Sequence, residues 1–161
     1  MKMSDQECPM TAEGKKKLDD ELKNLISVER ENVKVAIATA RSHGDLKENS
    51  DYHAAKERQS HIEGRIMDLQ SKLSRARVVD VSKIKSSKIV FGATVTLLDE
   101  TKGTEIVYQI VGEDEADLSK NKVSYMSPLG KALIGKEEGD TVTVKAPKGD
   151  IEYEVLSFEY K

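Results

Sequence analysis

Two acidic residues, Asp45 and Glu48, lie three positions apart, and their type and spacing suit the binding of a metal ion. They follow Gly44, at the point where one long helical pattern stops and a second begins. Carboxylates three positions apart converge when the turn that carries them is compact. Mg²⁺ prefers oxygen ligands and keeps several waters, so one or two protein carboxylates suffice when a partner supplies the rest. The pair therefore predicts half of a shared Mg²⁺ site.

A second interpretation gives these acids a structural role only. Acids are common in loops between helices, and Asp45 or Glu48 would then simply cap the second helix. The spacing alone favours this second interpretation, because short motifs are weak evidence for a function.

Basic and aromatic residues surround the acidic pair. Arg41 and Lys56 lie near it on opposite arms, where they suit the phosphates of a nucleic acid or, equally, pair with nearby acids. Arg58 and Arg65 are expected to pair with acids such as Glu57 or Glu63. Tyr52 either stacks on a base or closes the end of the helical core.

The element before the acidic pair is predicted to be a helix with an irregular apolar seam. Thr11 is its expected N-cap, and Gly14 stands where a capping box would have Glu or Gln, so the box is absent. The seam is irregular near Glu29 and Asn32, which predicts a stutter or a local loss of packing. Its apolar positions are Leu18, Leu22, Leu25, Val33, Ala36, Ile37 and Ala40.

The element after the acidic pair has a regular heptad seam, which is typical of a coiled coil. A short turn makes the two arms antiparallel, and arms of about 25–32 residues extend roughly 38–48 Å. The seam positions are Tyr52, Ala55, Gln59, Ile62, Ile66, Leu69, Leu73 and Ala76.

The apolar period changes from heptad to two after Val79, so residues 81–161 are predicted to form a second domain, a small antiparallel sheet with one helix. The chain is therefore of the α+β class, with a helical hairpin over residues 1–80. A linker is expected near residues 80–87. The predicted strands span residues 88–98, 105–111, 123–126, 140–146 and 151–160, and the helix spans 128–134.

Composition excludes several classes of protein. The chain has 161 residues, 34% charged, with a net charge of -3, so it is not a generally basic nucleic-acid binder. No apolar run approaches about 18 residues, so no membrane span is expected. Cys8 is the only cysteine in the sequence and is expected in a loose N-terminal arm. A single cysteine cannot form an internal disulfide, which fits a reducing cytoplasm. Residues 1–7 lack the apolar core of a signal peptide, so none is expected. The three histidines lack metal-ligand spacing, and Asp114–Asp117 is expected to be an acidic loop.

The run Ala40–Lys56 closely resembles the tip of the helical hairpin in the GreA/GreB family of bacterial transcription elongation factors. The resemblance extends over essentially the whole chain. It includes residues 9–18 at the start and, later, residues 90–96, 112–117, 127–128 and 133–136. The near-neutral hairpin, with 15 Lys+Arg against 15 Asp+Glu in residues 1–80, favours the GreA side of the family.

This resemblance implies a function for the hairpin. Such a factor is not an enzyme by itself: it inserts its coiled coil into the secondary channel of RNA polymerase and stimulates the polymerase's own cleavage of backtracked RNA. Asp45 and Glu48 match the acids that help to hold a second Mg²⁺, which the polymerase completes. Arg41, Lys56 and Tyr52 match positions along the 3′ segment of the nascent RNA.

The resemblance also implies an FKBP-like second domain that docks on the polymerase, association with DNA in the transcription complex, and a cytoplasmic monomer. Two other functions stay open. One is a polymerase inhibitor on the same scaffold that occupies the channel without cleavage, although the intact Asp45 and Glu48 pair argues against it. The other is a coiled-coil adaptor with no role in transcription.

Overall fold

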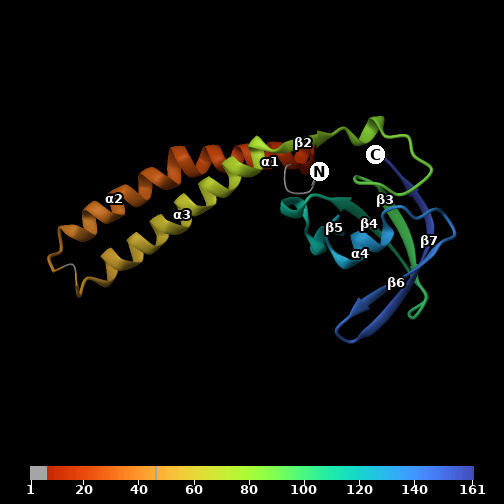
Figure 1. The fold of residues 1–161 in the computed structure, drawn as a ribbon. Helices are drawn as coiled ribbons and strands as arrows, with labels where there is room; N and C mark the ends of the chain where they lie inside the picture. Colours follow the sequence, from red (N-terminus) through yellow and green to blue (C-terminus); the bar gives the residue numbers. More distant parts are fainter. Residues whose placement is uncertain (1–6, 46) are drawn as a thin grey trace. The chain divides into compact units, whose positions relative to one another are not determined.

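The computed structural model describes residues 7–45 and 47–161 and contains a helical hairpin and a five-stranded sheet (Figure 1). The predicted α+β class is confirmed. One compact unit holds Cys8 and Lys15–Ala76, and the other holds Pro9–Gly14 and Arg77–Lys161. The assignment of separate domains to residues 1–80 and 81–161 stays a prediction. Leu46 of the tip motif and residues 1–6, where a signal peptide was considered, lie outside the described residues.

The first arm of the hairpin is continuous but changes its helical geometry once. It runs through α1 (Ala12–Asn24), a π-helical segment η2 (Leu25–Glu29) and α2 (Arg30–Arg41). The π-helical turn lies where the seam was expected to be irregular, and none of its residues is buried, so the predicted irregularity near Glu29 is confirmed. A π turn contains an extra residue and rotates the helix beyond it, which brings the apolar stripe back toward the second arm.

The second arm, α3 (Ser50–Ser74), has 25 residues and extends about 38 Å. It runs beside α2 (Figure 1). The predicted heptad seam is confirmed, because its central positions are buried. A core cluster joins Val33 of the first arm to Ile62 and Ile66, with Leu22 and Leu25 packed against it. The buried residues of α3 are Ala55, Ile62, Ile66 and Leu69.

Ion pairs between the arms flank the π-helical segment. Arg65 makes two hydrogen bonds to Glu21, at 2.7 and 2.9 Å, and Arg58 bonds Glu29 at 2.7 Å. Arg30 likewise makes two bonds to Glu63, at 2.9 and 2.8 Å. Arg58 and Arg65 do pair with acids, but not with Glu57 or Glu63: both bond an acid of the opposite arm, and Arg65 also bonds Asp68 on its own arm at 3.0 Å. These side chains are partly exposed, so each pair adds little to stability.

A two-stranded sheet lies where the sequence predicted none. Strand β1 (Cys8–Thr11) pairs with β2 (Ala76–Val79). The Cys8 amide donates a 2.9 Å hydrogen bond to the Arg75 carbonyl, so the expectation of a loose arm at Cys8 is wrong. Helix α3 also ends before Ala76. Strands of four residues are too short for their alternation to show in a sequence.

The main sheet has the order β5-β4-β3-β7-β6. Most pairs are antiparallel, as predicted, but β5 pairs with β4 in parallel because two 3-10 turns carry the chain back before it begins. The strands are β3 (Thr94–Asp99), β4 (Thr104–Val111), β5 (Lys122–Ser124), β6 (Thr141–Ala146) and β7 (Gly149–Glu159).

The core of the sheet lies on the face that α4 (Pro128–Leu133) covers. Ser127 is the N-cap of α4 and accepts a 3.0 Å hydrogen bond from the Gly130 amide, as predicted. Only the end of the predicted strand 88–98 is a strand. Before it, Gly92 adopts a φ of 93°, a left-handed conformation that breaks the extended chain. The buried core residues are Ile89, Ala93, Val95, Leu97, Ile110, Val123, Leu133, Val142 and Val155.

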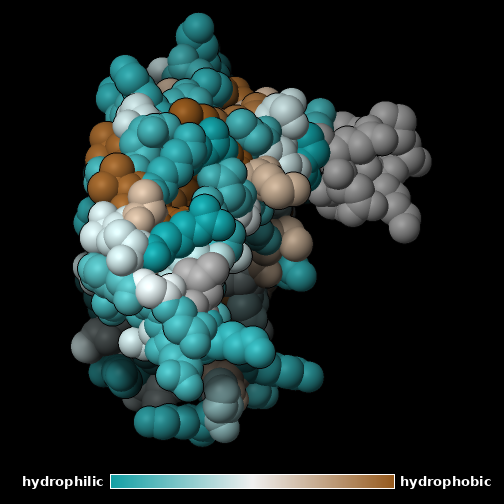
Figure 2. All heavy atoms as spheres, turned by 90° about the vertical axis from the view of Figure 1, so that its left-hand side faces the viewer, coloured by the Kyte–Doolittle hydropathy of each residue, from teal (hydrophilic) through white to brown (hydrophobic). Residues whose placement is uncertain are grey.

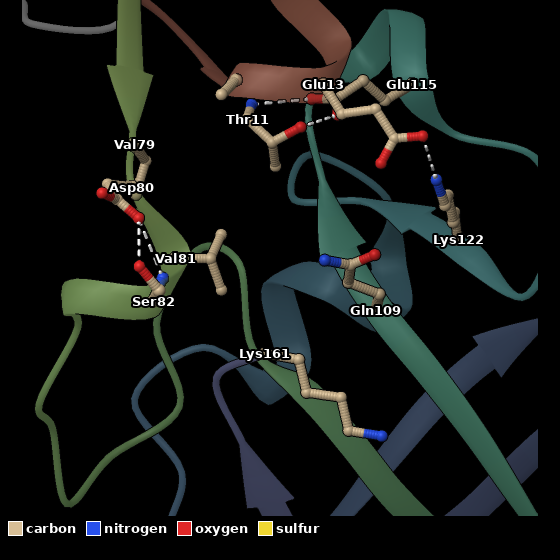
Figure 3. A pocket seen from close by; sticks show the side chains of 11 residues that line it. Thr11, Glu13, Val79, Asp80, Val81, Ser82, Gln109, Glu115, Lys122 and Lys161 are labelled. Carbon is tan, nitrogen blue, oxygen red and sulfur yellow. Dashed lines mark hydrogen bonds and ion pairs between the residues drawn. The ribbon is translucent and has the colours of Figure 1, made fainter.

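The first turn of α1 is capped from a distant part of the chain (Figure 3). The Thr11 hydroxyl accepts a 3.0 Å hydrogen bond from the Gly14 amide, so the predicted N-cap is confirmed. Glu115, in the 3-10 turn η4 (Glu113–Glu115), accepts from the Thr11 amide at 3.0 Å and from the Thr11 hydroxyl. The local capping box of α1 is absent, as predicted, and Glu115 of the predicted acidic loop accepts the Thr11 amide in place of its glutamate. A Cβ at Gly14 would collide with the Glu115 side chain, which explains the glycine.

Candidate functional site at the hairpin tip

A series of backbone hydrogen bonds closes the end of α2. The amides of Ser42, His43 and Gly44 donate to carbonyls of the last turn, at 3.1–3.4 Å. Gly44 has a φ of 115°, which an L side chain rarely adopts, so a glycine is needed for the chain to leave the helix in this direction. The acidic pair comes immediately after it.

Both tip carboxylates are exposed to solvent. Asp45 Oδ1 accepts a 3.0 Å hydrogen bond from the Lys47 amide, an Asx turn that folds the connection back. Within the described residues, the Glu48 carboxylate has no hydrogen bond or ion pair. Figure 2 views the molecule from the side of the tip, and hydrophilic residues dominate that surface. The structure thus places the acids in one short connection with carboxylate oxygens open to solvent.

The N-cap of α3 is Asn49, and neither acid takes that role. Asn49 Oδ1 accepts a 3.0 Å hydrogen bond from the Tyr52 amide. The interpretation that Asp45 or Glu48 merely caps the second helix is therefore wrong. The Glu48 carboxylate and Oδ2 of Asp45 are left available for another use, while Asp45 Oδ1 accepts the Lys47 amide.

The predicted basic and aromatic residues surround this connection. Arg41 is the last residue of α2 and is exposed, while Tyr52 and Lys56 lie one turn apart on α3. Lys56 Nζ donates a 3.1 Å hydrogen bond to Gln59. Tyr52 is half-buried and makes an edge-to-face contact with His53, with ring centroids 5.6 Å apart. Two cations and an aromatic ring therefore lie within two helical turns of the acids.

The donor set fits Mg²⁺ only as part of a larger site. The tip offers two carboxylates, which are suitable hard ligands. Elsewhere in the described part of the chain, as at the tip, no group of three or more His, Cys, Asp or Glu residues could hold a metal ion. His43, His53 and His61 are all exposed, as predicted. Asp45 and Glu48 could thus contribute ligands to a metal, but others must complete its coordination.

The sequence patterns assigned no role to Asn49, although a signal for one is present. Asparagine before Ser50 and Asp51 is a recognisable start of a helix, since Asn favours the N-cap and an acid favours the first turn. The capping half of its role could therefore have been found from its neighbours. Its second hydrogen bond, to the Ala40 carbonyl on the other arm, has no signature in the local sequence.

Two matches to one protein family cover nearly the whole chain. Residues 8–78 match the family described as transcription elongation factor, N-terminal, and residues 84–160 match transcription elongation factor, GreA/GreB, C-term. The chain belongs to the GreA/GreB family of transcription elongation factors.

The family's individual members agree with this assignment. The chain is 59% identical to the transcription elongation factor GreA of Hyphomonas neptunium over 95% of this chain and 98% of that protein. It is 56% identical to that of Alkalilimnicola ehrlichii over 94% and 97%. Among solved structures it is similar to the GreA factor homolog 1 (Gfh1) of Thermus thermophilus, 28% identical over 95% of this chain and 99% of that one, with a TM-score of 0.44.

Proposed function

We propose that this chain stimulates the cleavage of backtracked nascent RNA by RNA polymerase, with its hairpin inserted in the secondary channel. The observation that carries the proposal is the state of the tip acids. Asp45 and Glu48 are exposed, and Asn49 performs the capping that would otherwise explain them. A hairpin arm of about 38 Å is long enough to carry them into another protein. The family assignment supplies the polymerase as the partner.

In this proposal the chain contributes carboxylate ligands, and RNA polymerase completes the site. When bound, a shared Mg²⁺ supplies the Lewis acidity that turns water into a nucleophile toward a phosphodiester. Asp45 and Glu48 orient their oxygens toward that site. Arg41 and Lys56 neutralise phosphates of the RNA 3′ segment, and Tyr52 stacks beside it. The sheet domain docks on the polymerase and does not take part in the chemistry.

The test uses a stalled, backtracked elongation complex, with release of short 3′ RNA fragments in Mg²⁺ as the readout. D45N and E48Q should each lower the rate of stimulated cleavage by roughly 10²-fold, because each removes a charged ligand with little change of shape. D51N is the matched control: Asp51 is an exposed acid in the first turn of α3, so the same charge is lost outside the pair.

The competing functions predict other results. Wild-type cleavage by D45N would contradict the proposed role of the acids. Slower elongation with no cleavage product from the wild-type factor would favour the inhibitor, and failure to recover polymerase subunits in a pull-down would favour the adaptor.

A further inference from the structure

The side chain of Asn49 joins the two arms of the hairpin at its tip. Its Nδ2 donates a 2.5 Å hydrogen bond to the Ala40 carbonyl in the last turn of α2, while its Oδ1 accepts from the Tyr52 amide in α3. One side chain therefore bonds the end of one helix and the start of the next. It does so while half-buried, whereas both neighbouring acids are exposed.

The same carbonyl also fixes the other side of the acidic connection. The Ala40 oxygen accepts from the His43 amide at 3.1 Å as well as from Asn49. Ala40 itself is only 3% exposed, so this acceptor is anchored in the packed part of the hairpin. The acids thus lie in a connection whose two ends are hydrogen-bonded to one fixed point.

A further contact stabilises the segment between the acids. The His53 ring nitrogen Nε2 lies 3.2 Å from the Lys47 carbonyl, and the Lys47 amide donates to Asp45. Lys47 is therefore tied through its carbonyl to α3 and through its amide to Asp45. Asn49 and His53 therefore hold the acidic connection from α3, in addition to the bond that Asp45 itself accepts from Lys47.

Capping alone does not require asparagine at this position. Asp and Ser accept the hydrogen bond of a helix N-cap about as well as Asn. Asp has no donor for the Ala40 carbonyl, and Ser has a single, shorter hydroxyl, whereas the amide of Asn49 uses Oδ1 as the acceptor for the Tyr52 amide and a separate atom, Nδ2, as the donor to Ala40. The donor half of Asn49 is thus the part that capping does not explain.

We propose that Asn49 is a positioning residue for transcript cleavage. Its amide donor holds the connection that bears Asp45 and Glu48 against the end of α2. This inference rests on the proposed function. Groups that orient metal-binding carboxylates through hydrogen bonds typically change metal affinity or activity 10–100-fold when they are lost. The acids of a factor without this donor should therefore bind the shared Mg²⁺ more weakly.

The test compares N49S, which keeps a capping oxygen but loses the reach to Ala40, with the wild-type factor on backtracked complexes. We expect stimulated cleavage to fall about tenfold at low Mg²⁺ and to recover as Mg²⁺ is raised, so that the half-saturating Mg²⁺ concentration increases several-fold. Binding to polymerase, measured by competition with labelled wild-type factor, should be unchanged. N32S is the matched control, since Asn32 is exposed on α2 away from the tip.

The outcomes separate this inference from the one on which it rests. If D45N abolishes cleavage while N49S retains the wild-type rate and Mg²⁺ dependence, the positioning role is wrong and the proposed function stands. If D45N has no effect, the proposed function fails first. A loss of cleavage in N49S that is equal at all Mg²⁺ concentrations and parallels a loss of helicity would mean a structural role only and would overturn the inference. N49D, which keeps the cap but has no amide donor, should behave like N49S.

Discussion

The two arms of the hairpin begin with caps of different origin. Helix α3 is capped by Asn49, which accepts a hydrogen bond from the amide of Tyr52, three residues later in the chain. Helix α1 begins at a local cap, Thr11, whose own amide donates to Glu115, 104 residues away in the chain. The first cap can be recognised from a few neighbouring residues, while the second is completed by Glu115 of the folded sheet domain. The difference distinguishes a local device from one that forms only with tertiary structure.

The distant cap also explains a glycine that looks unfavourable. Gly14 costs about 1 kcal/mol relative to Ala in a helix. Its missing Cβ makes room for the Glu115 carboxylate, which accepts hydrogen bonds from the amides of Thr11 and Gly112. The cost in helix propensity is offset by bonds to a charged acceptor, which are stronger than neutral ones.

The largest expected effect comes from removing the distant acceptor. Glu115→Ala leaves the amides of Thr11 and Gly112 without their partner and should lower the free energy of unfolding of this region by about 2 kcal/mol. Hydrogen exchange of these two amides should speed up, while exchange of the Tyr52 amide at the tip stays the same. Unchanged protection of Thr11 would contradict the assignment of Glu115 as part of the cap.

The next prediction is that Gly14→Ala changes the stability in opposite directions in the wild type and in the Glu115→Ala variant. In the wild type, Gly14→Ala should destabilise by roughly 1–2 kcal/mol, because the new Cβ displaces Glu115 and breaks its bonds. In the Glu115→Ala background the same change should stabilise by up to about 1 kcal/mol, because only the gain in helix propensity remains. Calorimetric unfolding of the four proteins gives the coupling. Equal effects in both backgrounds would mean that Gly14 is not there to admit Glu115.

Sequence patterns predicted the hairpin well because its packing is periodic. The seam from Tyr52 to Leu73 is encoded every three or four residues, and even the irregularity near Glu29 corresponds to a real change to π-helical geometry. The short strands β1 and β2 and the true start of β3 were missed. Their hydrogen bonds join residues far apart in the chain, and runs of four residues contain too little periodicity to identify them.

The candidate site, like the fold, could be predicted from the sequence only in part. Residue types and spacing identified Asp45 and Glu48, but could not choose between metal ligands and helix caps. The structure excludes the helix cap, because Asn49 takes that role, and the role of the acids as metal ligands stays a prediction. The bond from Asn49 to the Ala40 carbonyl could not be predicted either, because the approach of the two arms at the tip depends on how the connection folds.

A smaller effect is expected from the local cap of α3. Asn49→Ala should cost about 1 kcal/mol, the usual contribution of an N-cap. The loss should be confined to the tip, so exchange of the Tyr52 amide should speed up while that of the Thr11 amide does not change. Together with Glu115→Ala, this variant gives reciprocal patterns at the two helix starts. Faster exchange at both starts in either variant would mean that the caps are coupled through the first arm.

The smallest predicted effects are pH dependences of stability. They compare two pairs of residues in the sheet domain, Asp80 with Ser82, which are close in the sequence, and Glu100 with Glu152, which are far apart in it. Asp80 accepts hydrogen bonds from the hydroxyl and amide of Ser82, at 2.6 and 3.1 Å, and these bonds lower the pKa of its carboxyl. Partial desolvation raises the pKa of Glu100, and a hydrogen bond with Glu152 and that residue's charge raise it further. The Glu100 amide also donates to the Glu152 carbonyl, so this pair depends on strand pairing.

The signs of these two dependences are opposite. The lowered pKa of Asp80 means stabilisation that is present above its ordinary pKa of 3.8 and is lost as the pH falls through the folded value. The raised pKa of Glu100 means stabilisation that is present below its ordinary value of 4.5 and is lost as the pH rises through the folded value. Asp80→Ala should therefore lower the Tm at pH 7, whereas Glu100→Gln should raise it, each slightly because both side chains are exposed to solvent. Both differences should shrink at pH 3, and a Glu100→Gln effect that persists there would show that ionisation of Glu100 is not its cause.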